Sequence, residues 1–294
     1  MITIILGFAT ALAYGFADFF GAVASKTLKS IYVTAVASLA GLAMMLIVSA
    51  SMGATFSAST MFWGISAGLA SAFAMSCLYA ALAIGPISII SPLTAVISAI
   101  VPSIVGILQG DRFSVWGWLA LVLIFAAVIL VGFVPGKDVR LPSAAGLVYG
   151  TMAGLGIGLV LVFLHQAPSD SGLAPIILLR IVGSVVLGCL SLFLFIRGRG
   201  ASRRAHVGSV DMRDKVSPKI WAAVVAAGLF DSLANLFFLL AARAGSLTVA
   251  SVLTALYPVG TILLARLVLR ERIATSQTVG IGLAIAGCML LAIA

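Results

Sequence analysis

The sequence predicts an all-α polytopic membrane protein whose ten transmembrane helices form two inverted five-helix repeats. Three observations support this fold class: the apolar composition, ten apolar stretches of helical length, and an internal repeat. Of the 294 residues, 63% are hydrophobic and 9% are charged, and the mean hydropathy is +1.27. A soluble domain could not keep that much apolar surface from water, so composition alone indicates a membrane protein.

Ten stretches are long enough to cross a bilayer, which takes about 20 mostly apolar residues in a helix. They lie at approximately 2–23, 31–51, 60–84, 87–108, 114–134, 143–165, 173–196, 219–243, 246–269 and 275–293. The first stretch ends at "AVA", which is typical of signal-peptidase sites. No Lys or Arg precedes it, however, and Asp18 interrupts it, so we expect a retained first helix.

Two segments match each other without gaps at an offset of 160 residues. "AALAIGPISIISPLTAVISAIVPSIVGILQGDRFS" begins at Ala80, and "LAARAGSLTVASVLTALYPVGTILLARLVLRERIA" begins at Leu240. The match also aligns polar positions: Ser91 with Ser251, Thr94 with Thr254, and Asp111-Arg112 with Glu271-Arg272. Five helices is an odd number, so the second repeat must be inverted across the membrane, as in many secondary transporters. We therefore expect one repeat over 1–142 and a second over 143–294.

The basic residues predict the orientation of the chain, whose formal net charge is +9. With the N-terminus outside, thirteen Lys and Arg residues fall in cytoplasmic loops and two fall outside, as the positive-inside rule requires. Seven of the thirteen lie within 197–219. We therefore expect both termini outside, a basic cytoplasmic loop at about 197–218, and a place in the bacterial cytoplasmic (inner) membrane. This distribution explains the charge without a nucleic-acid partner.

The chain resembles the drug/metabolite transporter superfamily, in its EamA-like branch. The resemblance rests on the two five-helix halves, on "ALAIGPISIISPL" and "AARAGSLTVASVLTALYPV", and on the acid-Arg pairs of "DRFS" and "ERIA". It implies substrates that are small polar or amphiphilic metabolites, and it implies export. One departure is that Pro258 aligns with Ser98, while the first half carries Pro92 and Pro102 instead. We therefore expect different local helix geometry in the two halves.

Asp231 and Asn235 lie one helical turn apart inside an apolar stretch, and Arg180 interrupts another. A charge at the bilayer centre costs roughly 2.5–3.5 kcal/mol on insertion scales, so each charge needs a partner or a function. Asp231 either is satisfied by a neighbouring helix or binds substrate or a proton. Arg180 either snorkels, pairs with an acid, or contacts an anionic substrate such as a carboxylate.

Polar stripes on the fourth and ninth helices are further candidates for binding substrate or a proton. They comprise Ser91, Thr94 and Ser98 on the fourth helix and Ser251, Thr254 and Tyr257 on the ninth. Repeat-related stripes would face each other across the inverted-repeat axis. The alternative is that small hydroxyl residues simply allow close helix packing.

The first and sixth helices carry the remaining candidates. Tyr14 and Asp18 share one face of the first helix and complete the set that could bind substrate or a proton. Gly150, Gly154 and Gly158 form two overlapping GxxxG units on the sixth, which predicts close helix packing.

We expect a secondary transporter that works by alternating access, with proton coupling through Asp231. The alternative is a flippase for a polar lipid or a lipid-linked sugar, which would open sideways to the bilayer. The sequence contains no HExxH, GxSxG or P-loop motif and no Cys/His cluster, so we expect no enzyme activity, cofactor or metal. The expected partners are a small-molecule substrate and the lipid bilayer, and the sequence is also compatible with a homodimer.

Overall fold

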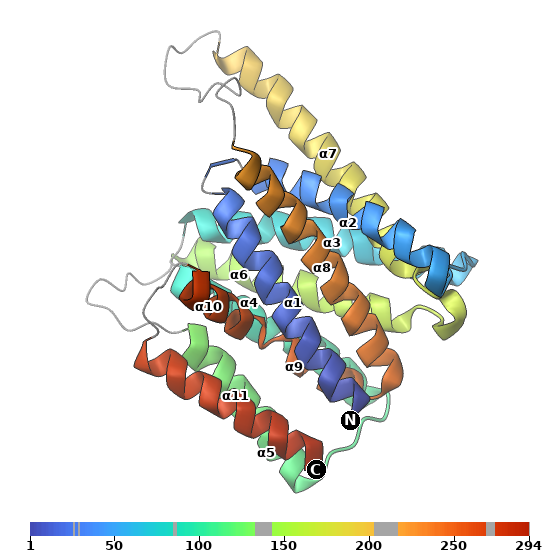
Figure 1. Ribbon diagram of the computed structural model, residues 1–294, viewed down its shortest axis with the longest axis vertical. Coiled ribbons are helices and arrows are strands. Elements are labelled where there is room, and N and C mark those ends of the chain that lie inside the picture. The colour runs from blue at the N-terminus through green and yellow to red at the C-terminus, as the bar shows by residue number, and fades with distance from the viewer. Residues whose placement is uncertain are drawn as a thin grey trace.

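The computed structural model describes residues 1–25, 27–28, 30–84, 87–132, 143–202, 217–268 and 274–293. Over these residues the chain is helical, apart from its connections and one β-bridge between Ala54 and Gly172. Figure 1 shows the elements, which are α1 (Ile2–Ser25), α2 (Ser30–Met52), α3 (Ala58–Ile84), α4 (Ile87–Leu108), α5 (Val115–Gly132), α6 (Ala144–Gln166), the 3-10 turn η1 (Ser169–Ser171), α7 (Ala174–Ser202), α8 (Pro218–Ala244), α9 (Leu247–Thr254), α10 (Tyr257–Val268) and α11 (Thr275–Ile293).

The helices match the predicted spans, with every end within six residues except in the ninth span. Six helices are long and apolar enough to cross a membrane: α1, α2, α3, α6, α7 and α8. Four shorter apolar segments lie in α4, in α5, across α9 and α10, and in α11. The all-helical membrane fold class is therefore confirmed for the described residues.

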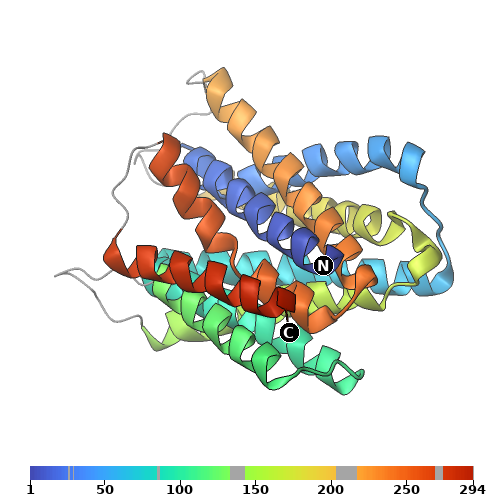
Figure 2. The same cartoon turned by 60° about the horizontal axis from the view of Figure 1, so that its bottom comes forward.

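The ninth span is the one place where the predicted element is wrong, because two helices replace the single helix expected at 246–269. Helix α9 ends at Thr254, residues 255–256 form a turn, and α10 begins at Tyr257. Pro258 lies in the first turn of α10, where its missing backbone N–H would have no partner within the helix. Figure 2 shows the change of direction between the two pieces.

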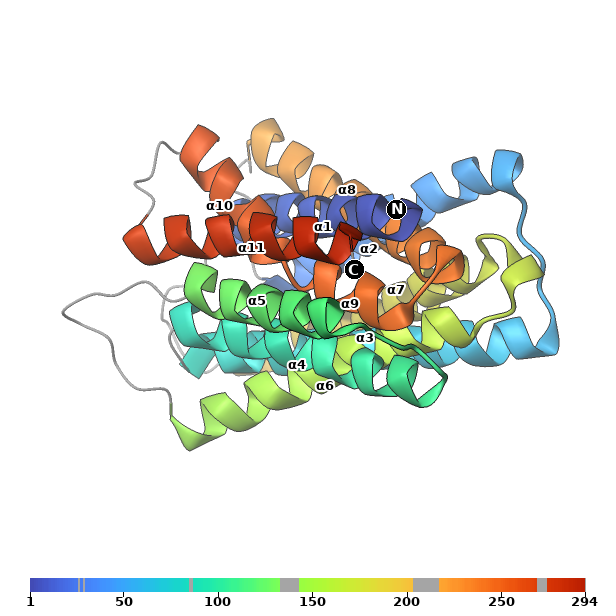
Figure 3. The same cartoon turned by 90° about the horizontal axis from the view of Figure 1, so that it is seen from below.

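Packing divides the bundle into a centre and two edges. Helix α1 packs along α8, and α3 packs along α6. Helix α6 also packs on α4, and α1 packs on α9 and α10. Helices α5 and α11 pair at one edge of the bundle, while α2 and α7 pair at the other (Figures 1 and 3).

Glycines on α6 bring its backbone close to α4. A Cβ on Gly154 would lie 2.7 Å from Ile97 Cβ, and one on Gly158 would lie 2.8 Å from Val101 Cβ, both on α4. Gly150 faces Leu93 and Ile90 of α4 at ordinary contact distance. The GxxxG glycines thus lie against α4, where small residues permit this approach.

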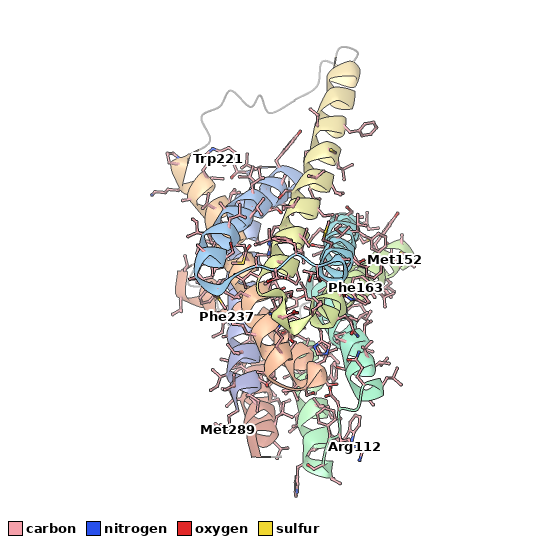
Figure 4. All side chains as sticks on the ribbon, turned by 90° about the vertical axis from the view of Figure 1, so that its right-hand side faces the viewer. Arg112, Met152, Phe163, Trp221, Phe237 and Met289 are labelled. Carbon is pink, nitrogen blue, oxygen red and sulfur yellow. The ribbon has the colours of Figure 1, made fainter. Side chains whose placement is uncertain are left out.

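The outer surface of the bundle is apolar. Met289, Trp221 and Met152 lie at its periphery in Figure 4 and are 66%, 44% and 39% exposed. Such a surface is unfavourable in water but matches the hydrocarbon of a bilayer. Polar chemistry is therefore to be sought inside the bundle and at its two ends.

Candidate substrate and proton site

An ion pair joins two helices inside the bundle. Nη1 of Arg180 on α7 donates to Oδ2 of Asp231 on α8. Asp231 lies at the middle of α8, thirteen residues from Pro218 and thirteen from Ala244. The Arg180 side chain is 6% exposed and the Asp231 side chain is 38% exposed. The carboxylate therefore has a partner and still presents part of its surface to the surroundings.

Hydrogen bonds to the backbone position both helices of the pair. Nδ2 of Asn235 donates to the carbonyl oxygen of Asp231 at 2.7 Å, so this amide stays within α8 and does not reach the carboxylate. Ser184 donates to Ser38 at 2.9 Å, and Ser38 donates to the carbonyl oxygen of Arg180 at 3.4 Å. These serines tie α7 to α2 around Arg180.

Helix α1 brings two more polar groups to the pair. Asp18 is close enough to Asp231 for the two carboxylates to interact electrostatically. Tyr14, one turn away, interacts electrostatically with Asp231, Arg180 and Asp18. The candidate residues of α1, α7 and α8 therefore lie together, and we call Tyr14, Asp18, Arg180 and Asp231 the central cluster.

Aromatic rings flank the central cluster where α1 meets α8. Phe16 packs edge-on against Phe230, with ring centroids 5.2 Å apart, and Phe20 stacks on Phe230 at 5.9 Å. Phe230 directly precedes Asp231 in the chain. Aromatic packing therefore forms part of the contact between α1 and α8.

Several buried polar atoms of the site have no hydrogen-bond partner among the described residues. They are Nε and Nη2 of Arg180, Oδ1 of Asn235 and Oγ of Ser232. An unsatisfied buried donor or acceptor is costly, and such groups concentrate at functional sites. The site thus holds unused hydrogen-bonding capacity next to the ion pair.

The polar residues of α4 do not join the central cluster. The hydroxyl of Thr94 donates to the carbonyl oxygens of Ile90, at 2.9 Å, and of Gly150 on α6, at 3.3 Å. Ser98 donates within α4 to the carbonyl oxygen of Ala95. Thr94 therefore faces α6, not the ninth span, and the prediction that it faces the matching stripe is wrong. The side chain of Ser91 lies outside the described residues.

The polar residues of α9 meet a serine that sequence reasoning did not select. Oγ of Ser251 lies 3.4 Å from Oγ of Ser103 on α4, and Thr248 donates to the carbonyl oxygen of Ser103. Thr254 donates within α9 to Ala250. Tyr257 packs against the apolar core of α4, α5, α9 and α11. These contacts join the two halves of the chain by packing and hydrogen bonds.

Arg243 ties the end of α8 to the connection between α6 and α7. Its guanidinium donates to the carbonyl oxygens of Gly172 and Pro168, each at 3.0 Å, and to Oγ of Ser171 at 2.8 Å. Sequence reasoning had treated Arg243 as a loop charge. The position of Arg243 in the last turn of α8 could have predicted this contact, because a basic residue there can bind nearby carbonyl groups.

Asp111 makes a second tie at the same end. Its Oδ2 accepts from Oγ of Ser246 at 2.7 Å and from the backbone N–H of Thr248 at 3.0 Å. The acid at the end of α4 thus caps the N-terminus of α9, where unpaired N–H groups and the helix dipole favour a negative charge. We refer to the bonds of Arg243 and Asp111 together as the outer contacts.

Three predicted features lie outside the described residues. They are most of the basic loop at 197–218, with His206 in it, and the pair Glu271-Arg272. Among the described residues, no group of three or more His, Cys, Asp or Glu residues is placed to hold a metal ion.

A helical bundle with an apolar surface and an interior ion pair defines an integral membrane protein. Residues 144–293 match the profile of the EamA-like transporter family. The chain belongs to this family, which is part of the drug/metabolite transporter superfamily, and the resemblance noted from the sequence is confirmed. The members of the family are transporters.

Comparison with solved structures supports the fold. One similar structure, described only as "Crystal structure of protein", superposes with a TM-score of 0.75 at 14% sequence identity. The alignment covers 99% of this chain and 96% of that one, so the whole fold is shared. No curated protein matches the sequence.

Proposed function

We propose that the protein is a secondary transporter that exports small polar or amphiphilic metabolites by alternating access, with the central cluster as its binding site. The Arg180–Asp231 ion pair carries this proposal. Its acid is at the middle of a membrane-spanning helix and is 38% exposed, while Asp18 and Tyr14 lie nearby. Ionisable groups at that depth are expensive in lipid and mark substrate or proton pathways.

We also propose that ten spans form two inverted repeats, over 1–142 and 143–294. Helix packing supports this. If spans 1 to 5 of the first repeat correspond to spans 6 to 10 of the second, each helix pair in contact should have a corresponding pair that is also in contact. The pair of α1 with α8 corresponds to that of α6 with α3, and α4 with α6 corresponds to the ninth span with α1. In such transporters the substrate site lies near the midplane, between the repeats.

Alternating access requires one end of the pathway to close while the other opens. At one end, Asp111 and Ser103 of the first half contact Ser246, Thr248 and Ser251 of the second half. The bonds of Arg243 connect helices within the second half at the same end. The charge distribution assigns that end to the outside. These bonds support a conformation closed toward the outside, from which transport proceeds by breaking them.

Asp231 is the proposed proton carrier. Protonation would neutralise its charge and weaken the bond to Arg180, so proton binding would alter the contact between α7 and α8. Asp18 interacts electrostatically with Asp231 and is a second candidate to carry the proton.

The test is transport by purified protein in vesicles with a set pH gradient, using substrates selected by a thermal-shift screen of amino acids, sugars, nucleosides and amines. Asp231→Asn should abolish transport or remove its pH dependence. Lys219→Gln is the control on the same helix, because this charged residue is exposed in the first turn of α8, far from Asp231 and from the outer contacts. Unchanged transport by Asp231→Asn at every pH would refute the coupling role, whereas movement of labelled lipid without solute transport would indicate the flippase alternative.

A further inference from the structure

We propose that the free edge of the Arg180 guanidinium binds a carboxylate group of the substrate. This inference rests on the proposed function, and it narrows the substrate to molecules that bear a carboxylate. The guanidinium has three nitrogens, and only Nη1 is engaged, by Asp231. Nε and Nη2 are buried and have no partner among the described residues, although the whole residue is 5% exposed.

The two unpartnered nitrogens form one side of the planar guanidinium. Nε and Nη2 donate in nearly parallel directions, a geometry that fits the two oxygens of a carboxylate in a bidentate pair. A single hydroxyl or amide oxygen could reach both donors only through bent hydrogen bonds, and it carries no negative charge. The arrangement therefore distinguishes a carboxylic acid from its amide.

The surroundings hold this edge in place before a ligand arrives. Asp231 fixes the other side of the guanidinium, and Ser38 bonds to the carbonyl oxygen of Arg180 while also accepting from Ser184. A fixed side chain loses less conformational entropy on binding than a free one.

Charge balance adds a condition. Two carboxylates, Asp18 and Asp231, already interact in the central cluster, with one arginine beside them. A further carboxylate would be repelled unless a positive charge arrives with it. That charge comes either from a proton on one of the two acids or from an ammonium group on the substrate. In both cases the substrate carboxylate binds Arg180. If the charge is a proton, acids without an ammonium group can bind; if it is the substrate's ammonium, they cannot.

The experiment measures thermal stabilisation of the full-length protein in detergent by matched compounds that share one apolar group. Leucine carries a carboxylate and an ammonium, isocaproate a carboxylate alone, isoamylamine an ammonium alone, and leucinamide an ammonium and an amide. Benzoate with benzamide and acetate with acetamide extend the series to other sizes. We expect each effective acid to stabilise at concentrations at least tenfold lower than its amide.

The compounds also separate the two sources of positive charge. Binding of leucine but not isocaproate assigns the positive charge to the substrate. Binding of isocaproate that strengthens as the pH falls assigns it to a proton. If no acid stabilises the wild-type protein better than its amide, the carboxylate inference is overturned, and this comparison needs no variant to fold.

Two variants then test the residue. Arg180→Lys keeps a positive charge beside Asp231 but removes the planar fork, so the preference for acid over amide should disappear. Arg112→Gln changes an exposed arginine at the end of the bundle, and this variant should retain the preference for acid over amide (Figure 4). An undiminished preference in Arg180→Lys would exclude Arg180 as the carboxylate partner and leave it a structural partner of Asp231.

The outcome is separable from that of the proposed function. Solute transport in vesicles without any preference for acids would overturn this inference and leave the transporter in place. Carboxylate binding without transport in vesicles would overturn the transporter proposal and leave the carboxylate inference in place.

Discussion

Arg180 and Asp231 are 51 residues apart in the sequence, yet their side chains bond to each other between α7 and α8. The pair is partly buried, because Asp231 is 38% exposed whereas Arg180 is 6% exposed. Removing one partner from a fully buried pair costs roughly 3–5 kcal/mol, since the other charge is left without compensation. Partial exposure reduces that cost.

We predict that Arg180→Gln and Asp231→Asn are coupled in stability. Each single variant should unfold at lower denaturant concentration than the wild type, and the double variant should lose less than the sum of the two. We expect a coupling free energy of about 1–2 kcal/mol, reduced from the fully buried case by the exposure of Asp231. Unfolding monitored by circular dichroism in mixed micelles measures all four proteins. Simple additivity would mean that the pair contributes nothing beyond its separate residues.

Two glycine-to-alanine substitutions should have opposite effects. Gly154→Ala should destabilise the protein, because the new Cβ would lie 2.7 Å from Ile97 Cβ and 2.9 Å from the carbonyl oxygen of Thr94. Gly282→Ala in α11 meets nothing within 4 Å and should stabilise by roughly 0.5–1 kcal/mol, since alanine loses less entropy in a helix. Thermal unfolding of both variants tests the contrast, and equal shifts would contradict the packing of α6 on α4.

A disulfide between positions 103 and 251 should hold the outer end closed. The two serine hydroxyl oxygens are 3.4 Å apart, so cysteines there lie near bonding distance. In a background without Cys77, Cys189 and Cys288, the Ser103→Cys/Ser251→Cys variant should form the bond on mild oxidation and stop transport. A reductant should restore transport, and full activity of the oxidised protein would show that this interface does not open.

The orientation can be tested by cysteine labelling. In the same cysteine-free background, His206→Cys should react with a membrane-impermeant maleimide only after the cells are opened, because its basic loop is predicted to be cytoplasmic. Arg112→Cys should react from outside, since Arg112 is exposed at the end of the bundle that carries the outer contacts. The reverse pattern would invert the topology.

Helix positions were predictable, because apolar length alone defines a membrane span. The break at residues 255–256 was not, although the position of Pro258 predicted that helix geometry differs between the two halves. Proline alone does not decide the matter: Pro92 and Pro102 both lie within α4, which runs unbroken from Ile87 to Leu108. The presence of a proline in the sequence therefore does not predict whether a helix breaks.

The candidate site was predictable as a set of residues but not as a set of contacts. Intramembrane charge singled out Asp231 and Arg180, and their pairing was one of several alternatives because helix adjacency was unknown. By sequence, Asp18 lies toward the predicted cytoplasmic end of its helix, where an interfacial role was the alternative to binding substrate. The outer contacts were missed because Asp111 and Arg243 lie near helix ends. A charge there is not placed in the apolar core of the membrane, so it does not mark a residue as functional.

The break in the ninth span has a mechanical consequence. Helix α9 packs on both α4 and α1, while α10 packs mainly on α1, where Gly15 lies against Gly260 and Thr261 donates to the carbonyl oxygen of Gly15. The two residues between them are the natural pivot. A change of angle at Ala255–Leu256 would therefore act on the contact between α10 and the part of α1 around Gly15, next to Tyr14, while the hydrogen bonds between α9 and α4 stay in place.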